Sequence, residues 1–332
     1  MNRRTFGLAC AGAALFATGA AASAQTRPAG PPGYPSKPVK LIVAAAAGSS
    51  PDSIGRTLAA KLGAAWNQPV LVENVPGLGG VTGTERMVRA PADGYTFAVT
   101  TIAAAAVGPS LIEKMPYDPA KDMEPVTLLM SLPNLLVVHP SVPVTNLREL
   151  IAYAKANPSK LRYGHPGAGT TPHLSGELLK QQAGIQMQGI PYRSSAQMTT
   201  DLLGGHYEVL FHNSSVLLPH AKGGAARVLG ITSAERVPTL PDIPTIAEAG
   251  GLKGFSVNAW WGLHAPAGTP ADIVAKVHAD VAAALAQPDV KAWIDGQGGV
   301  GGGDTPQALR AFQAAEAQKW RDLIRAANIK AD

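Results

Sequence analysis

The sequence is poor in the residues on which disulfide, thiol and metal chemistry depend. One of its 332 residues is a cysteine, Cys10, so no disulfide can form within the chain. The eight histidines are loosely spaced, and no His-Glu-x-x-His or similar set of metal ligands occurs. The sequence therefore predicts neither a metal site nor a cofactor.

Motifs of three enzyme classes are also missing. There is no Gly-x-Ser-x-Gly elbow, which exposes the nucleophile of many hydrolases, and no Walker loop for a nucleotide phosphate. The glycine-rich segment at residues 77–82 (GLGGVT) breaks the dinucleotide fingerprint at its last glycine. We therefore expect a binding protein rather than an enzyme, with a hydrolase as the weaker alternative.

Charge is scarce and mildly positive. Charged residues make up 15% of the chain, the net charge is +5, and no basic run resembles a nucleic-acid patch. Hydrophobic residues make up 46%, which supports a sizeable core, and the length suits two domains. After residue 24 no apolar run is long enough to cross a membrane. We expect a soluble monomer that does not bind nucleic acid.

Residues 1–24 have the layout of a secretory signal peptide. Two arginines, Arg3 and Arg4, precede an apolar run, and a small-x-small sequence at 22–24 precedes Gln25. The Sec and twin-arginine routes both fit this pattern. A retained anchor is the alternative, but the apolar run is too short to span a bilayer. The sequence predicts a periplasmic protein with a cleaved signal, followed by a flexible, Pro- and Gly-rich lead-in at 25–34.

From Pro38 onward, strand-like and helix-like segments alternate, which predicts an α/β fold with parallel sheets and helices on both faces. After Gly262 two long helices are expected. The predicted strands are 39–45, 70–73, 95–100, 126–129, 135–138, 161–164, 190–192, 209–212 and 226–232. The predicted helices are 53–65, 82–89, 147–156, 174–183, 196–203, 271–286 and 305–327.

Residues 163–173 (YGHPGAGTTPH) are the most informative segment. A predicted strand ends here, a Gly- and Thr-rich loop follows, and Pro172 stands where a helix begins. Such a turn leaves backbone N–H groups free at the positive end of the helix dipole, where an anion is favoured. A second turn of the same kind lies near residues 45–54. Two anion-binding turns on separate α/β units suggest a ligand clamped between two lobes.

Three loops fall at the carboxyl ends of predicted strands, where α/β sheets bind ligands. They are residues 47–52, the pair Thr100-Thr101 with the Ala-rich turn after it, and residues 167–171. Each has an ordinary structural interpretation as well. Ser and Asp are good helix N-caps whatever the function, and this applies to Asp52 in particular.

Ten short segments in a fixed order give the chain a specific resemblance. Five of them are 34–43 (YPSKPVKLIV), 68–77 (QPVLVENVPG), 92–96 (ADGYT), 240–250 (LPDIPTIAEAG) and 265–270 (APAGTP). The segments are distributed along nearly the whole length of the mature chain. The chain resembles the substrate-binding receptors of tripartite tricarboxylate transporters, the Bordetella-uptake-gene type of periplasmic solute-binding protein.

The resemblance implies a type II periplasmic binding protein, with two α/β lobes joined by two crossover segments. Domain 1 would be residues 35–131 plus 256–332, and domain 2 residues 132–255. Both lobes would grip a small organic carboxylate, and closure would present a new surface to permease subunits in the membrane. A periplasmic ligand sensor that feeds a signalling partner shares all of these features and stays open as an alternative.

The resemblance also implies a set of ligand contacts, carried over position by position. Those in the first lobe are Gly48, Ser49, Ser50, Asp52 and Thr101. Those in the second lobe are Ala168, Gly169, Thr170, Thr171, Tyr192, Arg193, Ser194, His212 and Asn213.

The chain departs from the family pattern at several of these loops. Pro51 removes one N–H donor, Ile102 begins an Ala-rich turn, and Ala168 stands where relatives often have a polar side chain. The family commonly has Asp where this chain has His212, so a ligand amino group is less favoured there. We therefore hypothesise a carboxylate with an apolar or aromatic body.

Three further positions have two interpretations each. Arg193 either pairs with the ligand carboxylate or is a surface residue after a strand. His173, in the first helical turn, is expected to brace its loop rather than take part in chemistry. The pair Trp260-Trp261, on the second crossover, is expected to pack in the core or hinge rather than stack on a ligand.

Overall fold

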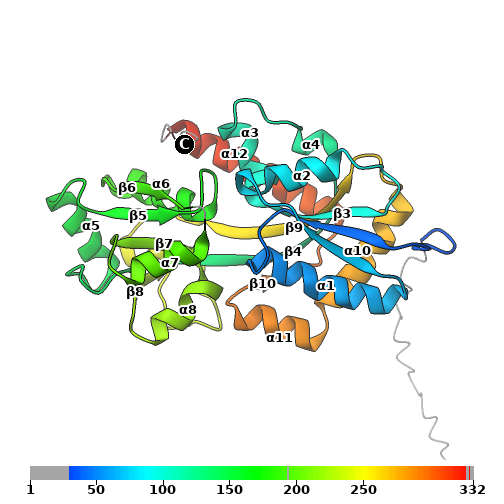
Figure 1. Cartoon of the computed structure of the whole chain (residues 1–332). Coiled ribbons are helices and arrows are strands. Elements are labelled where there is room, and N and C mark those ends of the chain that lie inside the picture. The colour runs from blue at the N-terminus through cyan, green and yellow to red at the C-terminus, as the bar shows by residue number, and fades with distance from the viewer. Residues whose placement is uncertain (1–29, 193, 327–328, 330–332) are drawn as a thin grey trace, which may run out of the picture.

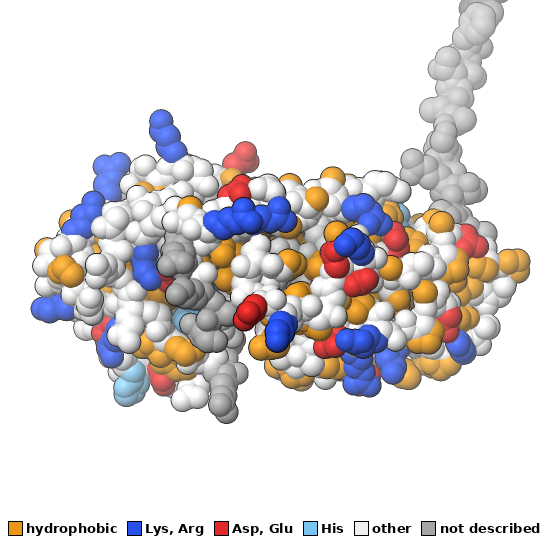
Figure 2. All heavy atoms as spheres, turned by 90° about the horizontal axis from the view of Figure 1, so that it is seen from above, with side chains coloured by type: hydrophobic (Ala, Val, Ile, Leu, Met, Phe, Trp, Pro, Cys, Tyr) orange, Lys and Arg blue, Asp and Glu red, His pale blue; other side chains and the backbone are white. Residues whose placement is uncertain are grey.

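The computed structural model of the protein describes residues 30–192, 194–326 and 329 (Figure 1). The predicted signal peptide, residues 1–24, and the predicted ligand contact Arg193 lie outside the described residues. The described chain forms two rounded halves with a waist between them, as Figure 2 shows from above. No helix among the described residues is both long enough and apolar enough to cross a membrane.

The packed chain begins before Pro35. Tyr34, which we assigned to the flexible lead-in, packs its ring edge-on against Tyr95 with 5.3 Å between centroids. Its hydroxyl donates to the carbonyl oxygen of Gly94, and Tyr34 also packs against the apolar core of the first lobe. The end of the predicted lead-in is therefore part of the first lobe.

The first lobe is built on a sheet whose three N-terminal strands are parallel. Strand β1 pairs with β2 on one side and β3 on the other. Alternate side chains of β1 and β3 pack under α1, and the others face the opposite side of the sheet. The elements are β1 (Val39–Val43), α1 (Ser50–Trp66), β2 (Val70–Asn74), η1 (Leu78–Gly80), α2 (Val81–Val88), β3 (Thr96–Thr101), η2 (Ala103–Val107), α3 (Gly108–Leu111) and α4 (Pro119–Asp122).

Two long antiparallel strands, β4 (Met123–Val138) and β9 (Asn258–Pro266), run between the halves (Figure 1). Strand β9 lies between β3 and β4, and the second part of β4 pairs with strands of the other lobe. Two predictions are therefore wrong: β4 is one strand rather than two, and the sheets are mixed rather than parallel. Pro133 does not interrupt β4 because the strand changes partners there, opposite the first residue of β9.

The tryptophan pair on β9 is buried in the core, as expected. Trp260 and Trp261 are 1% and 4% exposed and, as neighbours on a strand, belong to apolar clusters on opposite faces of the sheet. The indole N–H of Trp260 donates to Glu316 over 3.2 Å.

The second lobe repeats the sheet-and-helix arrangement with the strand order β8-β4-β7-β5-β6. Helix α6 covers one face, and α7 and α8 pack on the other. The strands are β5 (Arg162–His165), β6 (Gln188–Pro191), β7 (Val209–Asn213) and β8 (Arg227–Ile231). The helices are α5 (Leu147–Ala156), α6 (Thr171–Ala183), α7 (Ser195–Leu203), α8 (Ser214–Lys222) and α9 (Ile246–Gly250).

After β9 the chain stays in the first lobe. It forms α10 (Ala271–Leu285), α11 (Pro288–Gly296), β10 (Val300–Gly301) and α12 (Pro306–Ala326). The prediction of two long helices missed α11. Pro288 is the first residue of that helix, where its missing N–H costs no hydrogen bond.

Candidate functional site

The two predicted anion-binding turns have the same backbone geometry. Gly48 and Gly169 occupy the same left-handed conformation, with φ of +77° and +75°. The residue after each glycine is the helix N-cap, Ser49 or Thr170. Its hydroxyl donates over 2.6 Å to the carbonyl oxygen three residues earlier in both turns. The turns of the two lobes are therefore structural copies of one another.

The third residue of each helix closes its turn. Asp52 Oδ2 accepts the N–H of Gly48 over 2.8 Å, and His173 Nδ1 accepts the N–H of Gly169 over 3.3 Å. His173 thus braces its loop, which confirms the prediction. The second residue of each helix is a proline, Pro51 in α1 and Pro172 in α6. Neither proline contributes a backbone N–H.

Asp52 is engaged on both carboxylate oxygens. Oδ2 accepts from Arg56 Nε over 3.0 Å and Oδ1 from Asn74 Nδ2 over 2.9 Å. Burial opposes ionisation, yet the hydrogen bonds from Arg56, the Gly48 N–H and Asn74 hold the pKa of Asp52 below its usual value. This arrangement supports the structural interpretation of Asp52, because both carboxylate oxygens are engaged in fixing the turn.

The hydrogen bonds within each turn leave certain N–H and hydroxyl groups available to a ligand. First-turn N–H groups of a helix have no acceptor within the helix, and Ser50 and Thr171 are the first residues of α1 and α6. Their hydroxyls lie beside those N–H groups. Because each helix dipole directs its positive end to one of these residues, each turn is suited to an anion such as a carboxylate.

The two lobes touch at these turns. Asn213 Nδ2 donates to Ser50 Oγ over 3.5 Å, and the hydroxyls of Ser50 and Ser215 are 3.3 Å apart. On the other turn, a Cβ added to Gly79 of the first lobe would lie 3.9 Å from Thr170 Cγ2. The structure therefore brings three of the predicted contacts, Ser50, Thr170 and Asn213, to the boundary between the lobes.

A third helix end, which the sequence analysis missed, reaches the same place. Asn213 is the N-cap of α8 and Ser215 is its second residue, and α8 itself was not predicted. The available signal was the run Asn213-Ser-Ser before apolar residues, a common N-cap pattern.

Asn134 was also missed. It is fully buried in β4, where its Oδ1 accepts from Thr171 Oγ1 over 3.5 Å and its Nδ2 donates to Ser175 over 3.4 Å. Its N–H donates to Thr232 over 2.8 Å. Asn134 thus connects the second turn to the strand that runs between the lobes.

Thr101 and the Ala-rich segment form an apolar wall. The Thr101 hydroxyl donates to Gly79 O over 2.5 Å and accepts the Ala104 N–H over 3.2 Å, so it holds loops together. Segment η2 is a π-helical turn in which all five residues are buried. Its carbonyls at Ala104 and Ala105 accept from Tyr117 and Gln313, each over 2.9 Å. Ala103 packs closely against Gly79, because a Cβ added to that glycine would lie 2.9 Å from Ala103 Cβ.

Four predicted contacts of the second lobe are engaged within that lobe, lack polar side-chain atoms or are buried. Tyr192 donates its hydroxyl to Asp201 over 3.0 Å, and burial, reinforced by Asp201, raises the pKa of Tyr192 to about 12. Ser194 caps α7 by accepting the Gln197 N–H. Ala168 is half-buried in the loop and can offer only its backbone. His212 is buried at the end of β7.

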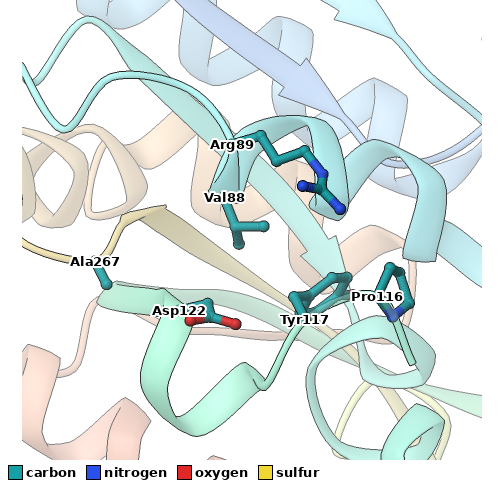
Figure 3. Close-up of a pocket in the computed structure, with 6 residues that line it drawn as sticks. All are labelled: Val88, Arg89, Pro116, Tyr117, Asp122 and Ala267. Atoms are coloured by element: carbon teal, nitrogen blue, oxygen red, sulfur yellow. The ribbon is translucent and has the colours of Figure 1, made fainter. Parts of the chain in front are cut away.

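A cavity of about 360 Å³ lies elsewhere, on the first lobe near α2 and α4 (Figure 3). None of the predicted contacts lines it. Its polar groups already have partners, since Arg89 pairs with Glu85 and Asp122 accepts the Asp118 N–H. The residues that line it are Val88, Arg89, Pro116, Tyr117, Asp122 and Ala267.

Comparisons with known proteins agree with this architecture. Residues 54–329 match the family described as "Tripartite tricarboxylate transporter family receptor". The chain is 34% identical to Protein BugT of Bordetella pertussis over 298 residues, which cover 90% of this chain and 91% of BugT.

Two solved structures extend the likeness to the fold. "R. palustris Rpa4515 with adipate" is 35% identical, with a TM-score of 0.84 over 90% of this chain and 99% of the other. "MatC (Rpa3494) from Rhodopseudomonas palustris with bound malate" is 31% identical, with a TM-score of 0.79 over 88% of this chain and all of the other. The chain has the fold of periplasmic solute-binding proteins and belongs to the tripartite tricarboxylate transporter receptor family.

Proposed function

We propose that this protein binds a small organic carboxylate between its two lobes in the periplasm and delivers it to a tripartite tricarboxylate-type permease. The observation that carries the proposal is the pair of matching turns on opposite lobes. Ser50 and Thr171 begin the two helices, and Ser50 also contacts Asn213 across the lobes. An anion held by both turns stabilises the closed state selectively.

The domain boundaries that we propose are residues 35–131 plus 256–332 and residues 132–255. The change of strand partners in β4 supports them: Pro133 still pairs with β9, whereas Asn134 pairs with β7. Closure would then bend the chain at β4 and β9, which are the connections between the sheets.

The ligand class is inferred from two observations. Adipate and malate, named in the two related structures, are both dicarboxylates. In this chain, the buried alanines of η2 next to Gly79 add an apolar wall. We therefore propose a carboxylate with an apolar or aromatic body.

A thermal-shift screen against aliphatic and aromatic carboxylates tests the proposal. A ligand that binds only the folded state raises Tm by mass action, and a receptor returns it chemically unchanged. Ser50→Val and Thr171→Val should each remove most of the shift, whereas Thr200→Val, on the exposed face of α7, should leave it intact. A screen in which no carboxylate raises Tm would contradict the proposal.

The permease is tested separately. The protein, loaded with its best carboxylate, should retain permease subunits from detergent extracts of membranes, and the unloaded protein should retain far less. Retention of a signalling protein in their place would instead support the sensor alternative.

A further inference from the structure

A buried ring nitrogen of His212 has no hydrogen-bond partner. The residue is 6% exposed, and its Nδ1 accepts the N–H of Asn213 over 2.7 Å. Its Nε2 is one of three buried side-chain polar atoms left unpartnered in the part of the chain that the structure describes. Buried polar groups are almost always satisfied, so this atom calls for an explanation.

The chemistry of the free nitrogen follows from its neighbour. Nδ1 accepts a hydrogen bond and therefore carries the lone pair, so in the neutral ring the proton is on Nε2. Burial lowers the pKa of His212 to about 4, which keeps the ring neutral at physiological pH. The unpartnered atom is thus an N–H donor for which the described residues supply no acceptor.

The position of His212 connects this donor to the candidate site. It is the penultimate residue of β7 and directly precedes Asn213, which contacts Ser50 across the lobes. Its side chain lies on the same face of the sheet as Leu210, and α8 covers that face through Leu217. The N–H donor needs a hydrogen-bond acceptor, and the positive end of the α8 dipole favours a negatively charged group. A carboxylate oxygen satisfies both.

We infer that the Nε2–H of His212 binds an oxygen at the far end of the ligand, which makes this residue a determinant of specificity. The inference rests on the proposed function, in which the turns at Ser50 and Thr171 hold the first carboxylate. The ligand would then carry a second oxygen acceptor, such as a carboxylate, beyond its apolar body. An ammonium group there would oppose a donor and the positive end of a helix.

Two matched series of acids test this inference by calorimetry at pH 7. The aliphatic probes are adipate, hexanoate and 6-aminohexanoate, and the aromatic probes are terephthalate, 4-methylbenzoate and 4-(aminomethyl)benzoate. In the series that binds, we expect the diacid to bind at least about ten-fold more tightly than the methyl-ended acid and the amino acid to bind most weakly, because a site built to hydrogen-bond discriminates strongly against analogues that lack the group.

Variants of His212 test whether this residue is responsible for the preference for the diacid. His212→Leu should weaken the diacid at least about ten-fold and change the methyl-ended acid less than about three-fold. His212→Gln keeps an N–H donor and should retain part of the preference, which covers the case in which the Leu variant does not fold. His206→Leu, at an exposed position of the same lobe, is the matched control and should bind like the wild type.

The outcomes separate the two proposals. Equal affinity for the diacid and the methyl-ended acid, or an equal loss for both in His212→Leu, would overturn the inference and leave carboxylate binding standing. Failure of every acid in both series to bind would contradict the proposed function, and this inference with it.

Discussion

The turns at Gly48–Asp52 and Gly169–His173 have one backbone geometry and two different braces. The first is closed by a carboxylate that Arg56 and Asn74 support. The second is closed by an imidazole that packs against a second imidazole, His165, with ring centroids 4.7 Å apart. The two turns thus present similar N–H groups, although one brace is ionic and the other aromatic; in the proposed function a ligand would contact both.

The lobes differ in their buried histidines as well. In the first lobe, His264 bonds through both ring nitrogens, to Thr100 over 2.8 Å and to Gln313 over 3.1 Å. In the second lobe, His212 bonds through Nδ1 alone. The two ring nitrogens of His264 are therefore both satisfied within its own lobe, whereas His212 keeps one ring nitrogen without a partner among the described residues.

Lowering the pH should produce the largest effect on folding stability, because the buried rings of His212 and His264 resist protonation. Burial lowers the pKa of His212 and of His264 to about 4, whereas an unfolded histidine titrates near about 6.5. Below about pH 6.5 the unfolded chain binds protons that the folded chain excludes. Stability is therefore full above that pH and falls by up to about 1.4 kcal/mol per pH unit for each ring as the pH drops towards about 4.

Urea unfolding at pH 7, 6 and 5 measures this slope. His212→Leu should remove about half of it, because one of the two rings no longer titrates. If the variant kept the full slope, the proposed neutral state of His212 would be wrong.

Asp52→Asn should produce the next largest effect, because it removes the charge from the first brace. Arg56 then loses its anionic partner and Asn74 its carboxylate acceptor, so we expect a loss of about 2 kcal/mol in unfolding free energy. The exposed change Glu235→Gln should cost less than about 0.5 kcal/mol. Equal losses for the two variants in urea unfolding would show that the first turn does not depend on its ionic brace.

The smallest difference in stability is expected between Gly48→Ala and Gly169→Ala, but these two variants should differ clearly in ligand affinity. A side chain costs about 1–2 kcal/mol in the left-handed conformation at either position. At Gly169 an added Cβ would also lie 3.0 Å from Leu111 of the other lobe, whereas at Gly48 nothing lies within 4 Å. We therefore expect Gly169→Ala to weaken binding of the best carboxylate from the screen more than Gly48→Ala, by about ten-fold, since about 1.4 kcal/mol of closure energy corresponds to that factor.

Calorimetry and urea unfolding on both variants separate the two effects. Equal affinities would mean that the contact between the Gly169 loop and Leu111 does not contribute to the bound state.

The local parts of the fold were predictable because they depend on nearby residues. The helices at 147–156 and 196–203 agree with α5 and α7 within a residue, and the helix-start patterns located both turns. The joining of 126–129 and 135–138 into β4 was not predictable, since Pro133 marks a break unless the partner strands are known. Strand β9 depends on two neighbours that lie far away in sequence.

The sequence by itself determined the glycines, hydroxyls and prolines of two matching turns, because those conformations need particular residue types over a few positions. It also determined the family, through short segments in a fixed order. Only the tertiary structure decided which polar side chains already have hydrogen-bond partners within the protein. It engaged Asp52, Thr101 and Tyr192 within the protein, added Asn134 and the start of α8 to the site, and left His212 Nε2 unpartnered. The reason is physical: a side chain's type fixes what it can donate or accept, but only packing supplies the atom that it meets.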